Sequence, residues 1–204
     1  MERGRPRNFN IEQALDAALD VFWRNGYQNA SLTELTRAMG ISKPSLYSAF
    51  GNKEQLYLKT LQRYREQRLL RHAEALAAEA DLKQALRNFL RSVAEMLTAP
   101  GLPGGCMVVN SAVTCDIAAL PPAVVAAIHE TVDQSSFTLL KDRLEAELRG
   151  RSLPGDTDIH RLVDYFTAIM CGMAVMAKVG ISQDRLLATI EQALAVLPDP
   201  VSDT

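Results

Sequence analysis

Residue types that most often carry catalytic or metal chemistry are scarce in this sequence. Histidine and cysteine each occur only three times in 204 residues, and their spacing relative to carboxylates matches no metal site. No nucleophile, base and acid emerge as a set, so the pattern disfavours an enzyme. We expect His72, His129 and His160 to be exposed, because they lie on polar helix faces or at a helix start.

Disulfide patterns, long hydrophobic runs and aromatic residues are scarce too. Three cysteines are an odd number, which favours a reduced cytoplasm over an oxidising compartment. No apolar run reaches the ~18 residues of a membrane span, and the segment after Met1 lacks the apolar stretch of a signal peptide. Aromatic residues make up 6%, which gives no indication of a large flat ligand. We expect a cytoplasmic protein with no metal, no cofactor and no membrane partner.

The charge that is present is distributed unevenly along the chain. Residues 1–65 hold ten Lys or Arg and six Asp or Glu, a net charge of +4, whereas residues 66–204 hold twelve and eighteen, a net charge of −6. Such a division is expected when only the N-terminal part meets phosphate groups. A protein that coats DNA along its whole surface would need positive charge throughout, so the acidic remainder disfavours that class.

Residues 31–53 carry the most informative local pattern. Ser31 and Glu34 form a capping-box pair that starts a short helix, and Gly40 is suited to the left-handed conformation that ends one. Ser42 caps a second short helix, with Pro44 in the first turn, where a missing N–H costs nothing. Two helices joined by so tight a turn predict a helix-turn-helix, whose second helix enters the DNA major groove.

The run GYQNASLTELTRAMGISKPSLYSAFGNKEQLY, residues 26–57, resembles the DNA-binding signature of TetR-type transcriptional repressors. Thr36, where alanine is usual, and Gly51, where many members have Lys, Pro or Ser, depart from that signature. The resemblance implies a homodimer that binds a palindromic double-stranded DNA operator. The matching positions are Leu35, Gly40, Ile41, Ser42, Leu46, Tyr47, Phe50, Lys53, Glu54 and Leu56.

Nine side chains in or before this motif are predicted to contact DNA. The first turn of the second helix should face base edges, and Lys53 should meet phosphate through its charge and a helix N-terminus. Tyr47 is expected at a phosphate or packed within the head, and Ser31 and Thr33 at a phosphate or only capping a helix. Arg5 belongs to an arm, residues 1–9, that either reaches a minor groove or makes no contact. The predicted set is Lys43, Pro44, Ser45, Tyr47, Ser48, Lys53, Ser31, Thr33 and Arg5.

The rest of the chain predicts helices throughout, so the expected fold is all-α with about nine helices. The Val-Val pair in residues 106–116 would also suit a strand, but helical neighbours favour a helix there. Residues 1–52 should form a three-helix DNA-binding head, residues 53–80 a single connecting helix, and residues 81–204 a body for effector binding and dimerisation. The expected helices are 11–25, 32–39, 43–50, 53–80, 82–99, 106–116, 122–149, 157–179 and 183–197.

The segment from Leu162 to Val179 carries almost no charge for four helical turns. A helix that is apolar all round must be buried on all sides. It is either a central core helix or part of a subunit interface. Its small residues Ala168, Gly172 and Ala174 would allow another helix to approach closely. The resemblance implies the interface, with the last two helices, about 157–197, packing against their two-fold mates in a four-helix bundle.

The body is expected to hold an effector site or a sensor. Cys106 follows two glycines at a helix start, where exposed N–H groups lower the pKa of a thiol, and a buried Lys178 beside it would act in the same direction. Cys106, Asn110 and Lys178 resemble the positions through which a branch of TetR regulators senses electrophiles or oxidants. The alternative is a tight turn before a buried cysteine. The predicted set is Cys106, Lys178, Asn110, Met107, Phe137, Phe166 and Met170, the last four as lining or plain core.

These observations predict a sequence-specific DNA-binding transcriptional regulator, a repressor released by an unknown small-molecule or electrophile effector or by thiol modification. The alternative is a small-molecule-binding protein or an enzyme in which the helix-turn-helix is only structural.

Overall fold

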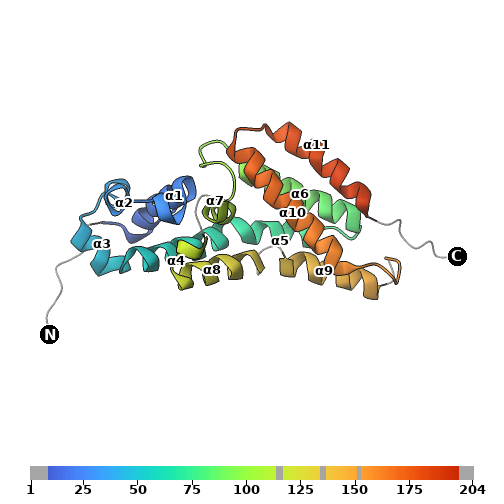
Figure 1. The fold of residues 1–204 in the computed structure, drawn as a ribbon. Helices are drawn as coiled ribbons and strands as arrows, with labels where there is room; N and C mark the ends of the chain where they lie inside the picture. Colours follow the sequence, from blue (N-terminus) through green and yellow to red (C-terminus); the bar gives the residue numbers. More distant parts are fainter. Residues whose placement is uncertain (1–8, 114–116, 134–136, 151–152, 198–204) are drawn as a thin grey trace.

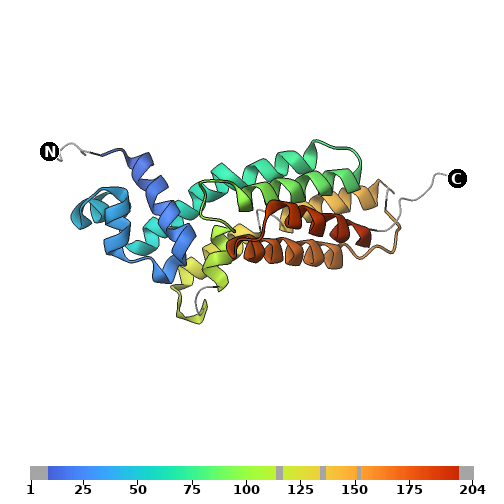
Figure 2. The same ribbon diagram turned by 90° about the horizontal axis from the view of Figure 1, so that it is seen from above.

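The computed structural model describes residues 9–113, 117–133, 137–150 and 153–197, and within them the chain is helical, with no strand (Figure 1). Arg5 and the rest of the predicted arm up to residue 8 lie outside the described residues, as does Cys115. The molecule is elongated, with the N-terminal helices at one end and a layered helical body at the other (Figure 2). The prediction of an all-α fold is confirmed.

The helices follow one another with short connections. The head holds α1 (Ile11–Asn29), α2 (Leu32–Met39) and α3 (Lys43–Phe50), after which α4 (Lys53–Tyr64), a π turn (Arg65–Leu69) and α5 (Leu70–Ala77) lead into the body. The body holds α6 (Leu82–Thr98), α7 (Met107–Val113), α8 (Pro122–Val132), α9 (Thr138–Arg149), α10 (Ile159–Lys178) and α11 (Gln183–Ala193), with short 3₁₀ turns at Ile117–Ala119 and Leu194–Val196.

Helix starts in the head agree with the predicted caps. The backbone N–H of Glu34 donates to Ser31 Oγ at 3.1 Å, and that of Ser45 donates to Ser42 Oγ at 3.3 Å. At the start of α4, Asn52 and Gln55 exchange side-chain and backbone hydrogen bonds in a complete capping box. These bonds form within three residues of sequence, so they fix the helix starts before any tertiary contact does.

Two helix predictions in the rest of the chain are wrong in detail. The connecting segment is not one continuous α-helix to residue 80: a π turn at Arg65–Leu69 interrupts it, and α5 ends at Ala77. The helix expected from residue 157 begins at Ile159, because Asp158 caps α10 through the N–H of Arg161. Of the expected helix 122–149 the structure describes α8 and α9, and since residues 134–136 lie outside the described residues, its continuity stays a prediction. Ser182, at the start of α11, makes no capping hydrogen bond.

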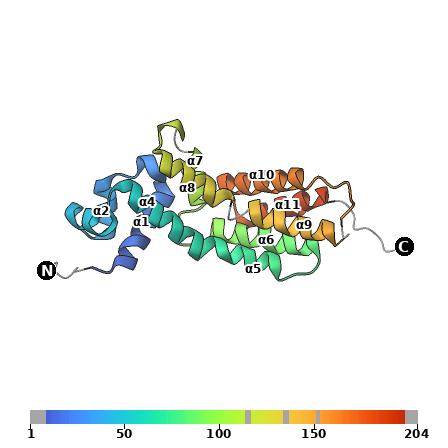
Figure 3. The same cartoon turned by 90° about the horizontal axis from the view of Figure 1, so that it is seen from below.

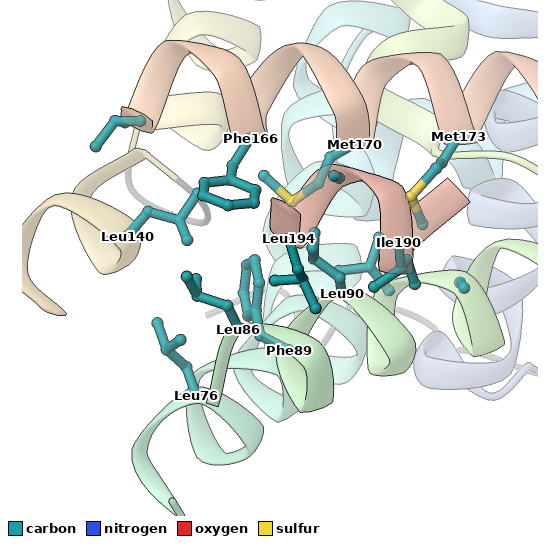
Figure 4. Packing of buried hydrophobic residues seen from close by; sticks show 14 of the residues in the cluster. Leu76, Leu86, Phe89, Leu90, Leu140, Phe166, Met170, Met173, Ile190 and Leu194 are labelled. Atoms are coloured by element: carbon teal, nitrogen blue, oxygen red, sulfur yellow. The ribbon is translucent and has the colours of Figure 1, made fainter. Parts of the chain in front are cut away.

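Two hydrophobic cores meet near the middle of the molecule. The first joins the head to α4, α7 and α8, which packs on α4 (Figure 3). The second lies among α5, α6, α9, α10 and α11, where Phe89 and Leu90 of α6 face Phe166 and Met170 of α10 (Figure 4). Met96 and Cys106 pack against both cores. The short helix α7 therefore belongs with the head, although it follows α6 in sequence.

Helix α10 is long and apolar enough to cross a membrane by length and composition alone. In this structure it packs against α6, α9 and α11, and its residues Leu162, Val163, Phe166, Met170 and Met173 are buried in the second core. That placement is the ordinary reason for so apolar a helix in a helical body.

Hydrogen bonds tie the end of α1 to the turn before α7. Trp23 Nε1–H donates to the carbonyl of Gly105 at 3.0 Å, and Asn110 Nδ2–H donates to the carbonyl of Trp23 at 3.0 Å. We call these three residues the Trp23 junction. Beside it, Lys178 Nζ, at the end of α10, donates to the carbonyl of Arg24 at 3.0 Å. The junction thus brings the head, α7 and α10 together at one point.

Gly105 suits the junction for two independent reasons. Its φ of 67° lies in the left-handed region, and a Cβ placed on it would come within 2.9 Å of the Ala174 carbonyl oxygen. Gly101, in the same loop, has a similar φ of 82° but nothing within 4 Å of its Cβ position. An alanine at Gly101 would therefore introduce backbone strain alone, whereas an alanine at Gly105 would introduce both strain and steric overlap.

We predict that Gly101→Ala lowers the free energy of unfolding by about 1–2 kcal/mol, from strain alone. Gly105→Ala should lower it by about 1–3 kcal/mol more, because its Cβ also overpacks against α10. Urea denaturation of both variants beside the wild type measures the difference. Equal losses at the two positions would show that α10 does not hold the turn closely.

Candidate DNA-binding surface and effector cavity

The second helix of the motif, α3, has one buried face and one exposed face. Leu46 and Phe50 are buried in the head, whereas Lys43, Pro44, Tyr47 and Ser48 are exposed. Tyr47 is 50% exposed although it is large and aromatic, which does not fit packing within the head as its only role. The exposed face is therefore free to meet another molecule.

Ser45 and the start of α2 combine capping with partial exposure. The hydroxyl of Ser45 lies 2.9 Å from Ser42 Oγ, so it takes part in the cap of its own helix. Ser31 and Thr33 are both exposed, and Ser31 serves as the cap of α2. Their hydroxyl groups lie beside the N-terminus of α2, where partly positive N–H groups favour an anion.

Lys53 is held against the head within the subunit. Its ammonium group donates to the carbonyl of Gln28 at 3.3 Å and lies 4.6 Å from the centre of the Tyr27 ring. Partial burial lowers the pKa of Lys53. A cation–π contact and one carbonyl leave donors of the ammonium group free, so the same side chain links the turn after α1 to α4 and still offers charge at the start of α4.

A cluster of charges fixes α1 on α4. The guanidinium group of Arg63 pairs with Glu12 and Asp16, both on α1. Its hydrogen bond lowers the pKa of Asp16, and the same pairing raises the pKa of Arg63. These charge-assisted hydrogen bonds add to the packing that holds α1 against α4.

A cavity lies where the two cores meet. It is partly open to solvent, and about 70 Å³ of it can hold the centres of water-sized molecules. Its walls come from the end of the π turn, α5, α6, the start of α7, α8 and α10. The lining residues are Leu69, His72, Val93, Met96, Leu97, Cys106, Val108, Val109, Val132, Thr167, Met170, Cys171 and Ala174.

The cavity gathers two residues of the predicted effector set, Cys106 and Met170. Met107 and Phe166 are fully buried in the first and second cores. Asn110 is buried in the Trp23 junction, and Phe137 packs at the edge of the second core. The predicted burial of Lys178 is wrong: it is partly exposed at the end of α10, where its ammonium group reaches the Arg24 carbonyl.

The thiol of Cys106 is connected to α4 at the wall of the cavity. The hydroxyl of Tyr64 donates to Cys106 Sγ at 3.3 Å, and the Tyr64 ring meets Trp23 edge to face at 4.9 Å. Burial raises the pKa of Tyr64, and the neighbouring Cys106 acts in the same direction. Cys106 thus touches the cavity, the last residue of α4 and the Trp23 junction at once.

His72 was expected at the surface, and that prediction is wrong. It is 5% exposed, lines the cavity, and approaches Ser92 Oγ through Nδ1 at 2.8 Å. Burial lowers its pKa to about 4. A sequence signal existed, because Leu69, His72 and Leu76 share one helical face, but charged neighbours on either side hid it. Thr167 and Cys171 of α10 also line the cavity and were not predicted.

Two family models match the chain, one in the head and one in the body. Residues 14–60 match bacterial regulatory proteins of the tetR family, and residues 83–194 match the tetracyclin repressor-like C-terminal domain. The chain belongs to the TetR family, and it is a DNA-binding transcriptional regulator. Among the described residues, no group of three or more His, Cys, Asp or Glu is placed to hold a metal ion.

Known relatives and solved structures agree with that assignment. The repressor ComR of Escherichia coli K12 is 30% identical over 202 residues, which cover 98% of this chain and 94% of ComR. A cysteine mutant of the TetR family regulator CifR, complexed with 26 bp double-strand operator DNA, is 35% identical with a TM-score of 0.88 and covers 95% of this chain and 100% of that one. Reduced NemR of E. coli, 19% identical with a TM-score of 0.74, shares the fold.

The buried, neutral state of His72 predicts a pH dependence of stability. Its pKa of about 4 in the folded protein lies below the ordinary value of 6.5, so the unfolded chain binds more protons between these values. This contribution is complete above pH 6.5 and is lost as pH falls toward 4, by at most about 1.4 kcal/mol per pH unit. His72→Gln should flatten that part of the stability curve, measured by urea denaturation across the range.

His129, exposed on α8, supplies the control. His129→Gln should leave the dependence of stability on pH as it is in the wild type. A slope that His72→Gln leaves as steep as in the wild type would contradict the burial of a neutral imidazole at this site.

Proposed function

We propose that the protein is a homodimeric repressor, which binds a palindromic operator through α3 of each subunit and leaves it when a small molecule fills the cavity. The observation that carries the proposal is the exposed face of α3, with Lys43, Pro44, Tyr47 and Ser48 directed away from the buried Leu46. The 35% identical CifR chain in complex with operator DNA supports it.

The DNA contacts divide into two kinds. Lys43 and Pro44, in the first turn of α3, meet base edges: the ammonium group donates to guanine O6 or N7, and the proline ring contacts a thymine methyl group. Tyr47, Ser48 and Lys53 meet phosphates, as do Ser31 and Thr33 at the start of α2. Arg5, outside the described residues, belongs to an arm suited to the minor groove.

A second copy of the chain is proposed to cover the outward face of α10. This face carries Ala168, Cys171, Gly172, Val175 and Val179, all exposed, with Val175 at 43% and Val179 at 73%. The expectation that α10 is buried on all sides is therefore not met within one subunit, and a row of exposed apolar residues marks an interface. Helices α10 and α11 with their two-fold mates would form the four-helix bundle.

The cavity is placed to act on the head through the connecting segment. Leu69 closes the π turn and His72 follows in α5, so both cavity contacts lie on the continuation of α4. Single π turns inside helices are frequent at functional sites. A ligand that favours a different conformation of this turn would swing α4. The α3 helices of the two subunits, which must lie about 34–36 Å apart on DNA, would then move. The ligand must bind the two conformations with different affinity to shift their populations.

Thiol modification is the second proposed route to release. Cys106 lines the cavity, so an added group would occupy the same space as a ligand. It would also disturb the hydrogen bond from Tyr64 at the end of α4. The two routes therefore act on the same contact between cavity and head.

Two lysines test the DNA interface. Lys43→Ala should cost about 1–3 kcal/mol on the preferred site and relax sequence choice at one position. Lys53→Ala should weaken binding to every sequence and reduce the slope of log affinity against log salt by about one. Fluorescence anisotropy with operator DNA selected from a random pool, at several salt concentrations, measures both effects.

Because Lys53 also holds the head through Gln28 and Tyr27, the unfolding of its variant is measured in parallel. Suppose that Lys53→Ala stays folded and changes the preferred DNA sequence, while Lys43→Ala changes neither affinity nor sequence preference. That result would show that α3 is not the recognition helix.

Gly172 tests the dimer. A Cβ placed on it meets nothing within 4 Å in the subunit, and glycine costs about 1 kcal/mol relative to good helix formers, so Gly172→Glu should leave the monomer folded. A charge buried between two α10 helices is costly, so the variant should sediment as a monomer and bind operator weakly. Ala126→Glu, at an exposed site on α8, is the matched control and should remain dimeric.

Sedimentation of the wild-type protein as a monomer across micromolar concentrations would refute the dimer. A dimeric Gly172→Glu would place the interface elsewhere.

A further inference from the structure

The cavity is built for an uncharged molecule. Among its thirteen described lining residues, nine are aliphatic or methionine and none is Asp, Glu, Lys or Arg. An ion moved into such surroundings loses its hydration without gaining a counter-charge, which costs several kcal/mol.

Two residues of its walls each carry a buried polar atom that has no partner among the described residues. These atoms are His72 Nε2, on α5, and Thr167 Oγ1, on α10. Both residues line the cavity. A buried polar atom left unpaired costs about 1–3 kcal/mol, so a molecule that satisfies either atom gains affinity there.

The hydrogen bonds around His72 decide what that molecule must offer. Ser92 Oγ lies 2.7 Å from the Phe89 carbonyl oxygen, which can only accept, and 2.8 Å from His72 Nδ1. A hydroxyl group has one hydrogen, so both short contacts are satisfied only when Ser92 donates to Phe89 and accepts from His72 Nδ1–H. The buried ring is neutral, since its pKa is about 4, and a neutral ring with a proton on Nδ1 has none on Nε2. Nε2 is therefore a hydrogen-bond acceptor.

We propose that the effector belongs to a defined class: an uncharged, largely apolar molecule with one hydroxyl group, an alcohol or a phenol, whose O–H donates to His72 Nε2. This inference rests on the proposed release by a cavity ligand and adds the chemistry that selects the ligand. The Thr167 hydroxyl supplies a second polar contact from α10. A ketone or ether of the same shape brings only acceptors and leaves Nε2 unsatisfied.

Binding of this kind would engage both sides of the connection to the head. His72 lies three residues after Leu69, the last residue of the π turn, while Thr167 belongs to the helix proposed to form the dimer. A hydroxyl group held by His72 would therefore contact α5, directly after the π turn whose conformation positions α4.

Three probes with one carbon skeleton test the inference: indane, 1-indanone and 1-indanol. Calorimetry with the full-length protein, without DNA, should give 1-indanol an affinity about three- to tenfold above that of the other two. His72→Phe keeps an aromatic ring but removes the acceptor, so the three probes should bind it equally. His129→Phe, at an exposed site, should keep the preference for the alcohol.

Ser92→Ala provides a second test that leaves the imidazole in place. Without Ser92 to accept from Nδ1–H, the ring can move its proton to Nε2, and the preference for 1-indanol should shrink. Equal affinities of the three probes for the wild type, no binding up to their solubility limits, or an undiminished alcohol preference in either His72→Phe or Ser92→Ala would overturn the proposal.

Failure of this inference and failure of the proposed function give different results. In one outcome, another compound releases the protein from operator DNA while the cavity shows no preference for 1-indanol. That result would overturn the alcohol class and leave the proposed repressor function supported. Binding of 1-indanol through His72 with unchanged operator affinity would support the cavity chemistry but not release by this ligand. In the Cys106→Ser variant, a retained alcohol preference would show that recognition does not need the thiol.

Discussion

The hydrogen bond from the Trp23 indole to the Gly105 carbonyl is the contact on which the rest of the arrangement depends. It joins α1 to the loop before α7, across more than eighty residues of sequence. It requires a glycine whose backbone is left-handed and lies against α10. The ring of Tyr64 packs on the same indole and reaches Cys106, so one aromatic pair determines how the head, α4 and the cavity wall meet.

The cavity follows from the meeting of two cores rather than from a gap within one. The π turn lets α4 pack on α1 and α7 while α5 packs on α6, and the walls between these contacts do not close completely. What remains is apolar, with a buried imidazole and a buried hydroxyl that have no partner in the described part of the chain. Such a site would exclude charged ligands and, among uncharged ones, would favour those that carry a hydrogen-bond donor.

Helix α10 carries apolar residues on two sides, one buried in the second core and one facing outward. Its buried side supplies Phe166, Met170 and Met173 to the second core, and its outward side carries small or β-branched residues suited to close helix packing. Cys171 lies on the outward side and also at the cavity, so a partner subunit over this face would cover an edge of the cavity. In the proposed dimer, this one helix would take part in both dimerisation and effector binding.

The sequence alone determined the helix-turn-helix, because caps such as Ser31, Ser42 and Asn52 act over three residues and Gly40 needs only its own left-handed backbone. It also determined the all-α class and the exposure of Lys43, since helical period assigns faces locally, but it left Tyr47 open between a phosphate contact and packing within the head. The burial of His72, the turn of Lys178 toward Arg24 and the π turn were decided only by tertiary structure. These features depend on which helix covers a given face: from the sequence His72 looks suited to solvent and Lys178 to burial, and only residues far away in sequence decide the surroundings of each.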